Sequence, residues 1–332
     1  MSASGSGTAA SSSSSNRASR REEQLKVPPK ETSGRQANSP TRTRMLRALE
    51  RHGYELESIL GRGAFAVVHR AFSRRRRCFV AIKEIDRRKS DWRYVDKFLP
   101  RELSIVRELR HDNVIECHQI FESKEIVCIV EEAATDGDLL QLIRRRHSLP
   151  ERELARPIAG QIFSALDYLR KKNIVHRDLK SDNVFMFQPE PTVKIGDFGF
   201  ARELKPGEYS NTFCGSRTYA APEVITGTNY TGTAVDVWST GVILFVMLTG
   251  YMPYSDRGGP REYVERLLGR RYAYPRHLQR LISDEAKALV YELLHPEPKK
   301  RPTPQEASRH PWLLKSSPLP CLQHTTNGQE TK

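Results

Sequence analysis

The sequence predicts an α+β protein with two lobes, a small lobe rich in strands followed by a larger helical lobe. Two strand-like segments joined by a glycine turn occupy residues 54–71, and apolar strands follow at 79–83, 114–121 and 126–130. Apolar side chains then recur at helical spacing over 151–172. The chain has 332 residues, of which 38% are hydrophobic, and is therefore long enough to bury such a core.

The two ends of the chain are predicted to lie outside this core. Residues 1–50 are rich in Ser, Gly, Ala and Arg and cannot bury enough apolar surface to offset the entropy lost on ordering, so we expect a disordered basic tail. Residues 314–332 are expected to form a flexible tail. Part of the formal charge of +14 lies in the first tail and in the run Arg74–Arg77. Such runs usually form solvated surface, and no nucleic-acid-binding motif accompanies them, so nucleic-acid binding is only the alternative interpretation.

Composition also limits the cellular setting. Neither a CxxC pair nor a zinc-ligand pattern is formed by the five cysteines, at 78, 117, 128, 214 and 321. No apolar segment follows the N-terminus as in a signal peptide. The longest apolar run, Val242–Leu248, falls far short of the roughly 20 residues that span a bilayer. We therefore expect a monomer with free thiols and no membrane contact, in the cytoplasm and also in the nucleus.

The turn Gly61–Val68 lies between the first two predicted strands and contains two glycines. Glycine lets backbone N–H groups approach a phosphate closely. The following strand ends at Lys83, and strand alternation points this side chain to the face opposite Ile82, into a cleft. Alone, the glycine turn is weak evidence, because an ordinary hairpin has the same appearance.

Several helices can be placed from their spacing and end signals. A helix is predicted over Asp91–Arg110, with its well-formed part beginning at Pro100, because proline is tolerated in the first turn. A core helix of the large lobe is expected over Glu151–Lys172, and the most apolar helix opens at Asp236. A capping box with proline at the first helical position marks a further helix start at Thr303.

The stretch His176–Gly199 carries the chemistry. Two polar loops flank a short predicted hairpin, which brings Asp178 and Asn183 close to Asp197. One carboxylate can orient a hydroxyl, while the other carboxylate and the amide can hold hard metal ions through oxygen. This combination suits phosphoryl transfer, in which catalysis is mostly positioning and charge neutralisation.

Taken in order over about 260 residues, these motifs resemble the eukaryotic protein kinases. The resemblance implies the bilobal protein kinase fold over 54–313, with a small β-rich N-lobe (54–131) that holds one regulatory helix. A hinge at 132–138 and a larger α-helical C-lobe at 139–313 complete the expected domain. The expected cofactors are ATP and Mg²⁺.

The resemblance also implies roles for individual residues. Asp178 would accept or orient the proton of the substrate hydroxyl, and Lys180 would stabilise the transferring phosphoryl group. Asn183 and Asp197 would bind magnesium. The helix residue Glu102 would hold a phosphate-binding lysine, which as a buried lysine needs a partner. The residues expected to bind ATP are Gly61, Arg62, Gly63, Ala64, Phe65, Ala66, Val68, Ala81, Lys83, Glu102, Glu132, Ala134 and Asp138.

The segment after Gly199 resembles a kinase activation segment that ends in Ala-Pro-Glu at Glu223. Thr212 is the implied activating phosphorylation site, and its phosphate would be drawn to Arg177. The resemblance places Ser216 against the catalytic Asp and Lys. It also implies a structural pair between Glu223 and Arg301, and a bracing role for Asp236 beneath the catalytic loop.

Three residues depart from the kinase pattern. Ala66 replaces the third glycine of the loop, so we expect a stiffer loop rather than lost binding. Glu131 stands where an apolar residue or Thr usually gates the pocket behind adenine, and its carboxylate must be paired, protonated or hydrated. Arg217 replaces the usual proline at the edge where substrate docks.

The form Asp-Leu-Lys-x-x-Asn is that of serine/threonine kinases. Within them the chain resembles the testis-specific serine/threonine kinases of the calmodulin-dependent kinase group, which implies a role in sperm-cell differentiation. The segments that carry this resemblance are Lys97–Glu102, Gly137–Leu140, Thr212–Ser216, Tyr219–Glu223 and Met252–Tyr254.

The expected partners are protein substrates. Asp138 and Asp182 would place negative charge on the substrate cleft and favour basic residues before the target Ser or Thr. An upstream activating kinase or a chaperone is a further expected partner. The alternative is a pseudokinase or scaffold that binds partners without transfer, and the intact set Lys83, Asp178, Asn183 and Asp197 argues against it.

Overall fold

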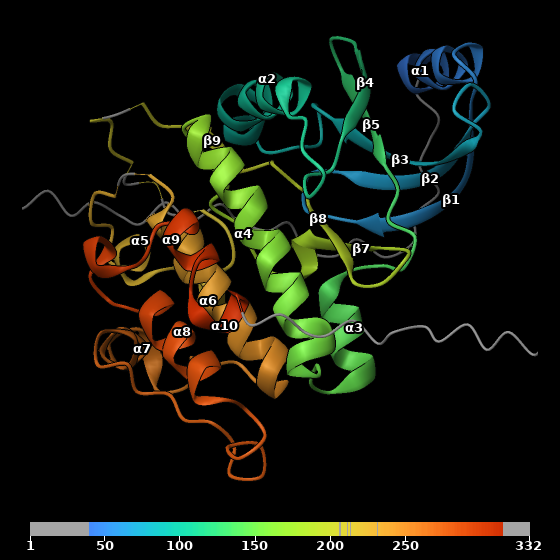
Figure 1. Cartoon of the computed structure of the whole chain (residues 1–332). Helices are drawn as coiled ribbons and strands as arrows, with labels where there is room; N and C mark the ends of the chain where they lie inside the picture. The colour runs from blue at the N-terminus through green and yellow to red at the C-terminus, as the bar shows by residue number, and fades with distance from the viewer. Residues whose placement is uncertain (1–39, 206, 211, 213, 231, 315–332) are drawn as a thin grey trace, which may run out of the picture.

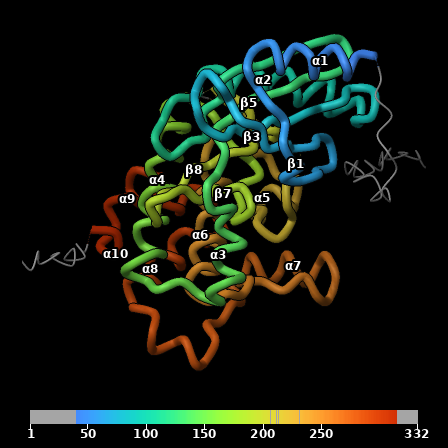
Figure 2. Tube along the Cα trace, turned by 90° about the vertical axis from the view of Figure 1, so that its right-hand side faces the viewer, coloured from blue at the N-terminus to red at the C-terminus, as the bar shows by residue number. Residues whose placement is uncertain are grey.

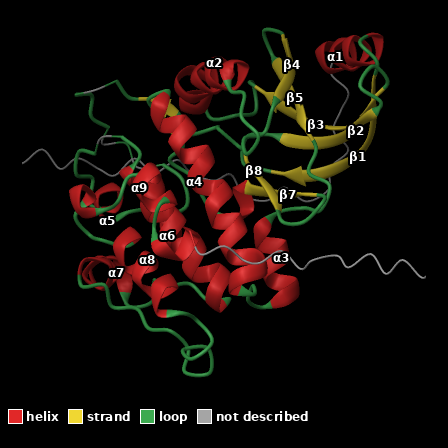
Figure 3. Ribbon diagram, in the orientation of Figure 1, coloured by secondary structure: helices red, strands yellow, loops and turns green. Residues whose placement is uncertain are grey.

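The computed structural model describes residues 40–314, apart from 206, 211, 213 and 231. It has the predicted two lobes, with the five-stranded sheet in the small lobe and most helices in the large one (Figures 1 and 3). The small-lobe sheet is antiparallel, in the order β1-β2-β3-β5-β4. Its strands are β1 (Tyr54–Arg62), β2 (Val67–Ser73), β3 (Cys78–Asp86), β4 (Cys117–Glu122) and β5 (Ile126–Glu132).

Both faces of this sheet are covered, which explains the continuous apolar run in β5. Strand alternation sends Ile126, Cys128 and Val130 to one face and Val127 and Ile129 to the other, and all five are buried. The first face packs against helix α1 (Pro40–Arg51), and the second joins the core that contains helix α2 (Leu99–Glu108). The two helices accordingly lie on opposite sides of the sheet (Figure 1).

Helix α1 corrects the prediction that residues 1–50 are disordered throughout. Met45 and Leu49, one helical turn apart, are buried in the outer cluster of the sheet. Arg42 donates two hydrogen bonds to Glu84, with Nε–Oε1 at 2.8 Å and Nη2–Oε2 at 3.1 Å. The composition of residues 1–50 is dominated by polar residues, and it does not reveal the short amphipathic helix at their end. Residues 1–39 lie outside the described part of the chain.

Helix α2 begins close to where the sequence predicted, with Pro100 in its first turn. A turn of π-helix, Tyr94–Phe98, precedes it and accounts for the helical spacing seen from residue 91. Strand β4 starts at Cys117 rather than Val114. Val114 instead makes a parallel bridge to Ile195, and Ile195 exchanges backbone hydrogen bonds with Asn113 and Ile115 at 2.9 and 2.8 Å. This segment therefore joins the small lobe to the large one.

The large lobe is built around two long helices, α4 and α6. Every residue of α6 from Val235 to Thr249 is buried, as expected for the most apolar helix of the sequence. The capping box of Thr303 and Glu306 is present at the start of α9. The helices are α3 (Leu139–Arg146), α4 (Arg156–Lys171), α5 (Pro222–Ile225), α6 (Ala234–Thr249), α7 (Gly259–Leu268), α8 (Asp284–Leu293), α9 (Pro304–Ser308) and α10 (Pro311–Leu314).

Two small strand pairs lie at the junction of the lobes. The predicted hairpin is present as β7 (Val184–Phe187) and β8 (Thr192–Ile195). Strands β6 (Ile174–Val175) and β9 (Arg202–Glu203) form the second pair. The hairpin lies between the sheet and α3 (Figure 1), and α4 packs against its second strand, β8 (Figure 2). None of the helices described is long and apolar enough to cross a membrane.

The burial of Leu49 predicts that α1 stabilises the sheet. We expect Leu49→Ala to lower the free energy of unfolding by about 2–5 kcal/mol, because the truncation removes apolar burial and leaves a cavity. Chemical denaturation of the full chain measures this change. The exposed neighbour provides the control, since Glu50→Ala should change stability by less than about 0.5 kcal/mol. Equal effects of the two substitutions would show that α1 does not support the sheet.

Candidate functional site

The β7–β8 hairpin brings the two polar loops together as predicted. Val184 pairs with Ile195 at its open end, and Gly196 N donates to Asn183 O at 3.0 Å. Asp236, fully buried at the start of α6, accepts from the backbone N of His176 at 2.8 Å and of Arg177 at 2.9 Å. The predicted brace beneath the first loop is therefore present. These contacts fix the backbone on either side of Asp178.

The Asp178 carboxylate accepts a hydrogen bond on each of its two oxygens. Its Oδ1 accepts from Ser216 N at 2.7 Å, and its Oδ2 accepts from Lys180 Nζ at 2.9 Å. Lys180 Nζ also donates to Ser216 Oγ at 3.2 Å. Burial alone would lower the pKa of Lys180, but the Asp178 carboxylate beside it raises that pKa. The lysine therefore stays charged, and the expected contact of Ser216 with both residues is present.

A second charged cluster joins β3, α2 and the loop that follows β8. Lys83 on β3 donates from Nζ to Glu102 Oε1 at 2.7 Å and to Asp197 Oδ1 at 2.8 Å. Burial would lower the pKa of Lys83, but Asp197 and then Glu102 raise it well above its usual value. Lys83 in turn lowers the pKa of Asp197 to about 2. The predicted Lys83–Glu102 pair thus forms as an ion pair that also includes Asp197.

The oxygen atoms of Asn183 and Asp197 suit a magnesium ion. Asn183 donates its amide Nδ2 to Asp178 O at 2.8 Å, which leaves the Oδ1 oxygen as an acceptor. Asp197 is ionised and uses one oxygen for Lys83. Magnesium is held in proteins by one or two such oxygens together with substrate phosphates. The donor set therefore fits the metal that the sequence predicted.

Several of the residues expected to bind ATP lie together on the first three strands of the small lobe. Strand β1 ends at Arg62, and Gly63 N donates to Ala66 O at 2.8 Å to close the turn before β2. Val68 pairs with Lys83 across β2 and β3, and Ala81, two residues before Lys83, shares its face. The structure brings these residues together; their contacts with nucleotide remain a prediction.

Tyr94 is a part of the site that the sequence did not reveal. Its ring stacks on Phe65 at the tip of the glycine turn, with centroids 4.3 Å apart and planes 7° from parallel. Its hydroxyl donates to Glu102 Oε2 at 2.8 Å. Tyr94 therefore links the phosphate-binding turn to the Lys83–Glu102 pair. No spacing rule relates it to Glu102, because the π-helical turn breaks the helical register between them.

The connection between β5 and α3 contains the expected hinge residues. Thr135 N and Asp136 N both donate to Met186 O at 3.2 Å, which seats the hinge on β7. The Glu132 side chain accepts from Lys194 Nζ at 2.7 and 2.8 Å and from Glu116 N at 2.9 Å, so its carboxylate is engaged within the protein. Asp138 caps α3 by accepting from Gln141 N at 2.8 Å. Burial raises the pKa of Asp138, and the nearby Asp182 raises it further.

Glu131 lies next to Ala81 on β3 and next to Cys117 on β4. Burial raises the pKa of its carboxyl to about 7; Lys83 opposes this change, while Glu102 and Asp197 add to it. The sequence left open whether this carboxylate is paired, protonated or hydrated. The raised pKa favours a carboxyl that is protonated below neutral pH. A protonated carboxyl can donate a hydrogen bond, whereas an ionised one can only accept.

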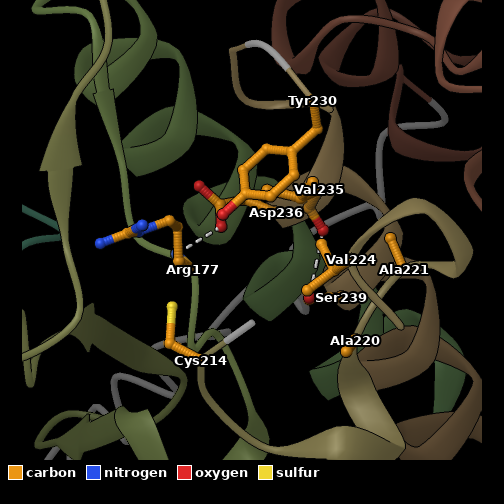
Figure 4. A pocket seen from close by; sticks show the side chains of 9 residues that line it. All are labelled: Arg177, Cys214, Ala220, Ala221, Val224, Tyr230, Val235, Asp236 and Ser239. Atoms are coloured by element: carbon orange, nitrogen blue, oxygen red, sulfur yellow. Dashed lines mark hydrogen bonds between the residues drawn. The ribbon is translucent and has the colours of Figure 1, made fainter. Parts of the chain in front are cut away.

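The activation segment is tied to Arg177 and Tyr230. Arg177 Nε donates to Phe200 O at 2.7 Å and Nη1 to Ser210 Oγ at 3.4 Å, while Nη2 is buried without a hydrogen-bond partner in the described part of the chain. Tyr230 OH donates to Thr212 O at 3.3 Å. Arg177, Tyr230 and Cys214 line a cavity of about 20 Å³ (Figure 4). Burial raises the pKa of Cys214, as expected for a packed thiol.

The end of the activation segment is anchored in the large lobe. Glu223 accepts two hydrogen bonds from Arg301, at 2.6 Å from Nη1 and 2.8 Å from Nη2, and both side chains are buried. Arg301 also donates to the backbone O of Ala234 at 2.9 Å. The predicted structural pair is therefore present. Arg217, which replaces the usual proline, stacks over Tyr263 of α7 with its guanidinium carbon 5.5 Å from the ring centroid.

The raised pKa of Glu131 predicts a pH-dependent stability. The carboxyl is ionised in the unfolded chain above about pH 4.5 but stays protonated in the folded chain up to about pH 7. The folded state therefore binds more protons, and this group lowers stability as the pH rises through that window. We expect Glu131→Gln to be more stable than the wild type by roughly 2 kcal/mol at pH 8, and the difference to shrink towards pH 5. Denaturation at both pH values measures it, and a constant difference would contradict the prediction.

Comparison with known proteins agrees with this geometry. The protein kinase domain family matches residues 54–313. Testis-specific serine/threonine-protein kinase 1 of Homo sapiens is 39% identical over 291 residues, 86% of this chain and 78% of that kinase. Testis-specific serine/threonine-protein kinase 3 of Homo sapiens is 38% identical over 265 residues, which cover 79% of this chain and 96% of that kinase. Kinase 2 of Mus musculus is 37% identical over 276 residues, covering 81% and 76%. The chain therefore belongs to the protein kinase family and is a serine/threonine protein kinase.

Proposed function

We propose that this kinase transfers the γ-phosphate of ATP to Ser and Thr of proteins in sperm-cell differentiation and is activated by phosphorylation of Thr212. The observation that carries the catalytic part is the arrangement of Lys180 between Asp178 and Ser216. The names of the relatives support the cellular part. The cytoplasm and the nucleus remain the proposed locations.

Asp178 is the group that orients the substrate hydroxyl. Ser216 N and Lys180 each bind one of its oxygens, so the carboxylate cannot rotate freely. A hydroxyl brought to this carboxylate gives up its proton as the phosphoryl group arrives. Lys180 lies beside that point and stabilises the negative charge that develops on the transferring group.

ATP occupies the cleft between the glycine turn and the two polar loops. Lys83 binds the α- and β-phosphates, and Glu102 fixes its position. Asn183 and Asp197 would hold the magnesium ion through their side-chain oxygens. When bound, magnesium neutralises charge on the phosphates. Asp197 contacts Lys83 directly, which holds these acidic and basic groups together.

The switch at Thr212 rests on the surroundings of Arg177. This guanidinium has a buried nitrogen without a hydrogen-bond partner in the described residues, and it contacts the activation segment through Ser210. A phosphate on Thr212 would supply acceptor oxygens of opposite charge. Because Arg177 directly precedes Asp178, the same contact would hold the catalytic loop and the activation segment together.

The charges on the substrate side favour basic targets. Asp182 is exposed, and Asp138 lies close enough for the two carboxylates to affect each other. We expect peptides with Arg before the target Ser to be phosphorylated faster than matched peptides with Ala there. Equal rates with the two peptides would contradict this preference. An upstream kinase or a chaperone that prepares Thr212 remains a proposed partner.

The hydrogen bond from Tyr94 to Glu102 predicts a positioning role. Tyr94→Phe keeps the ring that stacks on Phe65 but removes this bond to a buried carboxylate. Bonds to charged groups contribute about 1.5–3 kcal/mol, so we expect kcat/KM for ATP to fall by about ten-fold. Steady-state kinetics measures the change, with Tyr291→Phe, at an exposed tyrosine, as the control. An unchanged kcat/KM in Tyr94→Phe would rule out this role.

Activation through Thr212 predicts a specific response to phosphatase. We expect phosphatase treatment to lower the activity of the wild-type kinase by about ten-fold or more, because the contact with Arg177 is lost. The variant Thr212→Ala should have this low activity from the start and should not respond to phosphatase. Thr228→Ala, at an exposed threonine of the same lobe, should behave like the wild type. A Thr212→Ala kinase with full activity would exclude the switch.

A further inference from the structure

A second polar pocket lies on the small lobe, away from the catalytic cleft. It has a volume of about 330 Å³, within the range of pockets that bind small ligands. Residues from three parts of the sheet line it, namely the start of β1, the turn from β2 to β3, and the start of β4. These residues are Tyr54, Ser73, Arg75, Arg76, His118 and Gln119.

Two of these residues carry positive charges without a counter-charge. In the described part of the chain, the guanidinium groups of Arg75 and Arg76 have no ion-pair partner, whereas Arg74 in the same turn pairs with Glu55. Both arginines are exposed, yet the backbone that presents them is fixed. Arg74 N donates to Gly53 O at 2.8 Å and Arg77 N to Ser73 O at 2.7 Å.

The uncharged walls of the pocket present hydrogen-bond donors. Tyr54 OH donates to Gln119 Oε1 at 3.1 Å, which leaves the Gln119 Nε2 amide as a donor. Ser73 Oγ accepts from Arg76 N at 3.3 Å, which leaves the hydroxyl hydrogen of Ser73 to be donated. The side-chain oxygens of Gln119 and Ser73 thus accept hydrogen bonds from within the protein, and their N–H and O–H groups remain to donate to a ligand.

His118 adds a buried polar atom without a hydrogen-bond partner. Its side chain is 6% exposed, and no hydrogen bond reaches Nδ1 from the described residues. The closest carboxylate oxygen, Glu116 Oε1, lies 3.7 Å from that atom, and Glu116 also faces Arg110 Nε at 3.7 Å. Burial lowers the pKa of His118 and Arg76 lowers it further, while Glu116 and Glu132 oppose this change.

From this arrangement we propose that the pocket binds a phosphate monoester, as carried by a phosphorylated Ser or Thr or by free phosphate. Two neighbouring guanidinium groups match the double charge of a phosphate monoester, and the amide and hydroxyl donors match its several acceptor oxygens. The site is separate from the nucleotide-binding residues and uses Arg75 and Arg76 of the run Arg74–Arg77, to which the kinase chemistry gives no role. A phosphorylated segment seated here would contact the start of β1, directly after α1.

The test is a titration of the full chain followed by NMR at constant ionic strength. The probes are inorganic phosphate, a phosphoserine heptapeptide and its unphosphorylated form. We expect the first two to shift the side-chain amide of Gln119 and the ring signals of His118, and the third to leave them unchanged. The backbone amide of Gly63 reports separately on phosphate in the nucleotide cleft. Tighter binding of the peptide would identify the ligand as a phosphorylated side chain, and equal binding would identify it as phosphate itself.

Two double variants of the same turn distinguish specific binding in the pocket from non-specific attraction to positive charge. Arg75→Gln with Arg76→Gln should weaken phosphate binding at least ten-fold, whereas Arg74→Gln with Arg77→Gln removes the same charge outside the pocket and should weaken it less than two-fold. Equal weakening by both would overturn the proposal, as would the absence of shifts at Gln119 and His118 in the wild type. Stronger shifts with a single-stranded oligonucleotide than with the phosphopeptide, lost equally in both variants, would assign the surface to nucleic acid instead.

Discussion

The ammonium of Lys83, on a side chain that is 13% exposed, is the constraint on which the rest of the site depends. A charge removed from water requires opposite charges and hydrogen bonds around it, and here they come from Glu102 and Asp197. The three residues belong to β3, to α2 and to the segment after β8, so neutralising one lysine fixes three separate parts of the chain relative to one another. Tyr94 extends this set to the tip of the glycine turn. The readiness of the cleft for ATP therefore follows from one local electrostatic requirement.

In the large lobe, the charge of Asp178 is likewise stabilised by hydrogen-bond donors that the surrounding structure holds in place. Asp236 binds the backbone before Asp178, and the Glu223–Arg301 pair anchors the segment from which Ser216 reaches the carboxylate. Each buried charge has partners on a different element, so the loops that carry the chemistry are held by the rigid core beneath them. Arg177 differs in having a buried nitrogen still unpartnered in the described residues. This nitrogen could bind a phosphate group, which is why we propose that phosphorylation of Thr212 acts through Arg177.

Much of this arrangement could be predicted from the sequence, because the decisive residues are linked by short local structures. A four-residue hairpin turn sufficed to place Asp178 and Asn183 near Asp197. Two features could not be predicted, for physical reasons. Helix α1 is stable because it covers the outer face of the sheet, a tertiary effect that composition does not contain. Tyr94 reaches Glu102 through a π-helical turn, where helical spacing no longer indicates which side chains meet.

Together, the cluster around Lys83 and the cluster around Asp178 make the chain a phosphoryl-transfer catalyst. The most direct test is the transfer of phosphate from magnesium-ATP to a generic basic protein by the full chain, comparing the wild type with Asp178→Asn at equal thermal stability and equal ATP binding. Loss of the orienting carboxylate should lower the rate by at least about a hundred-fold, within the range typical of a lost general base. Equal rates for the two proteins would contradict the account.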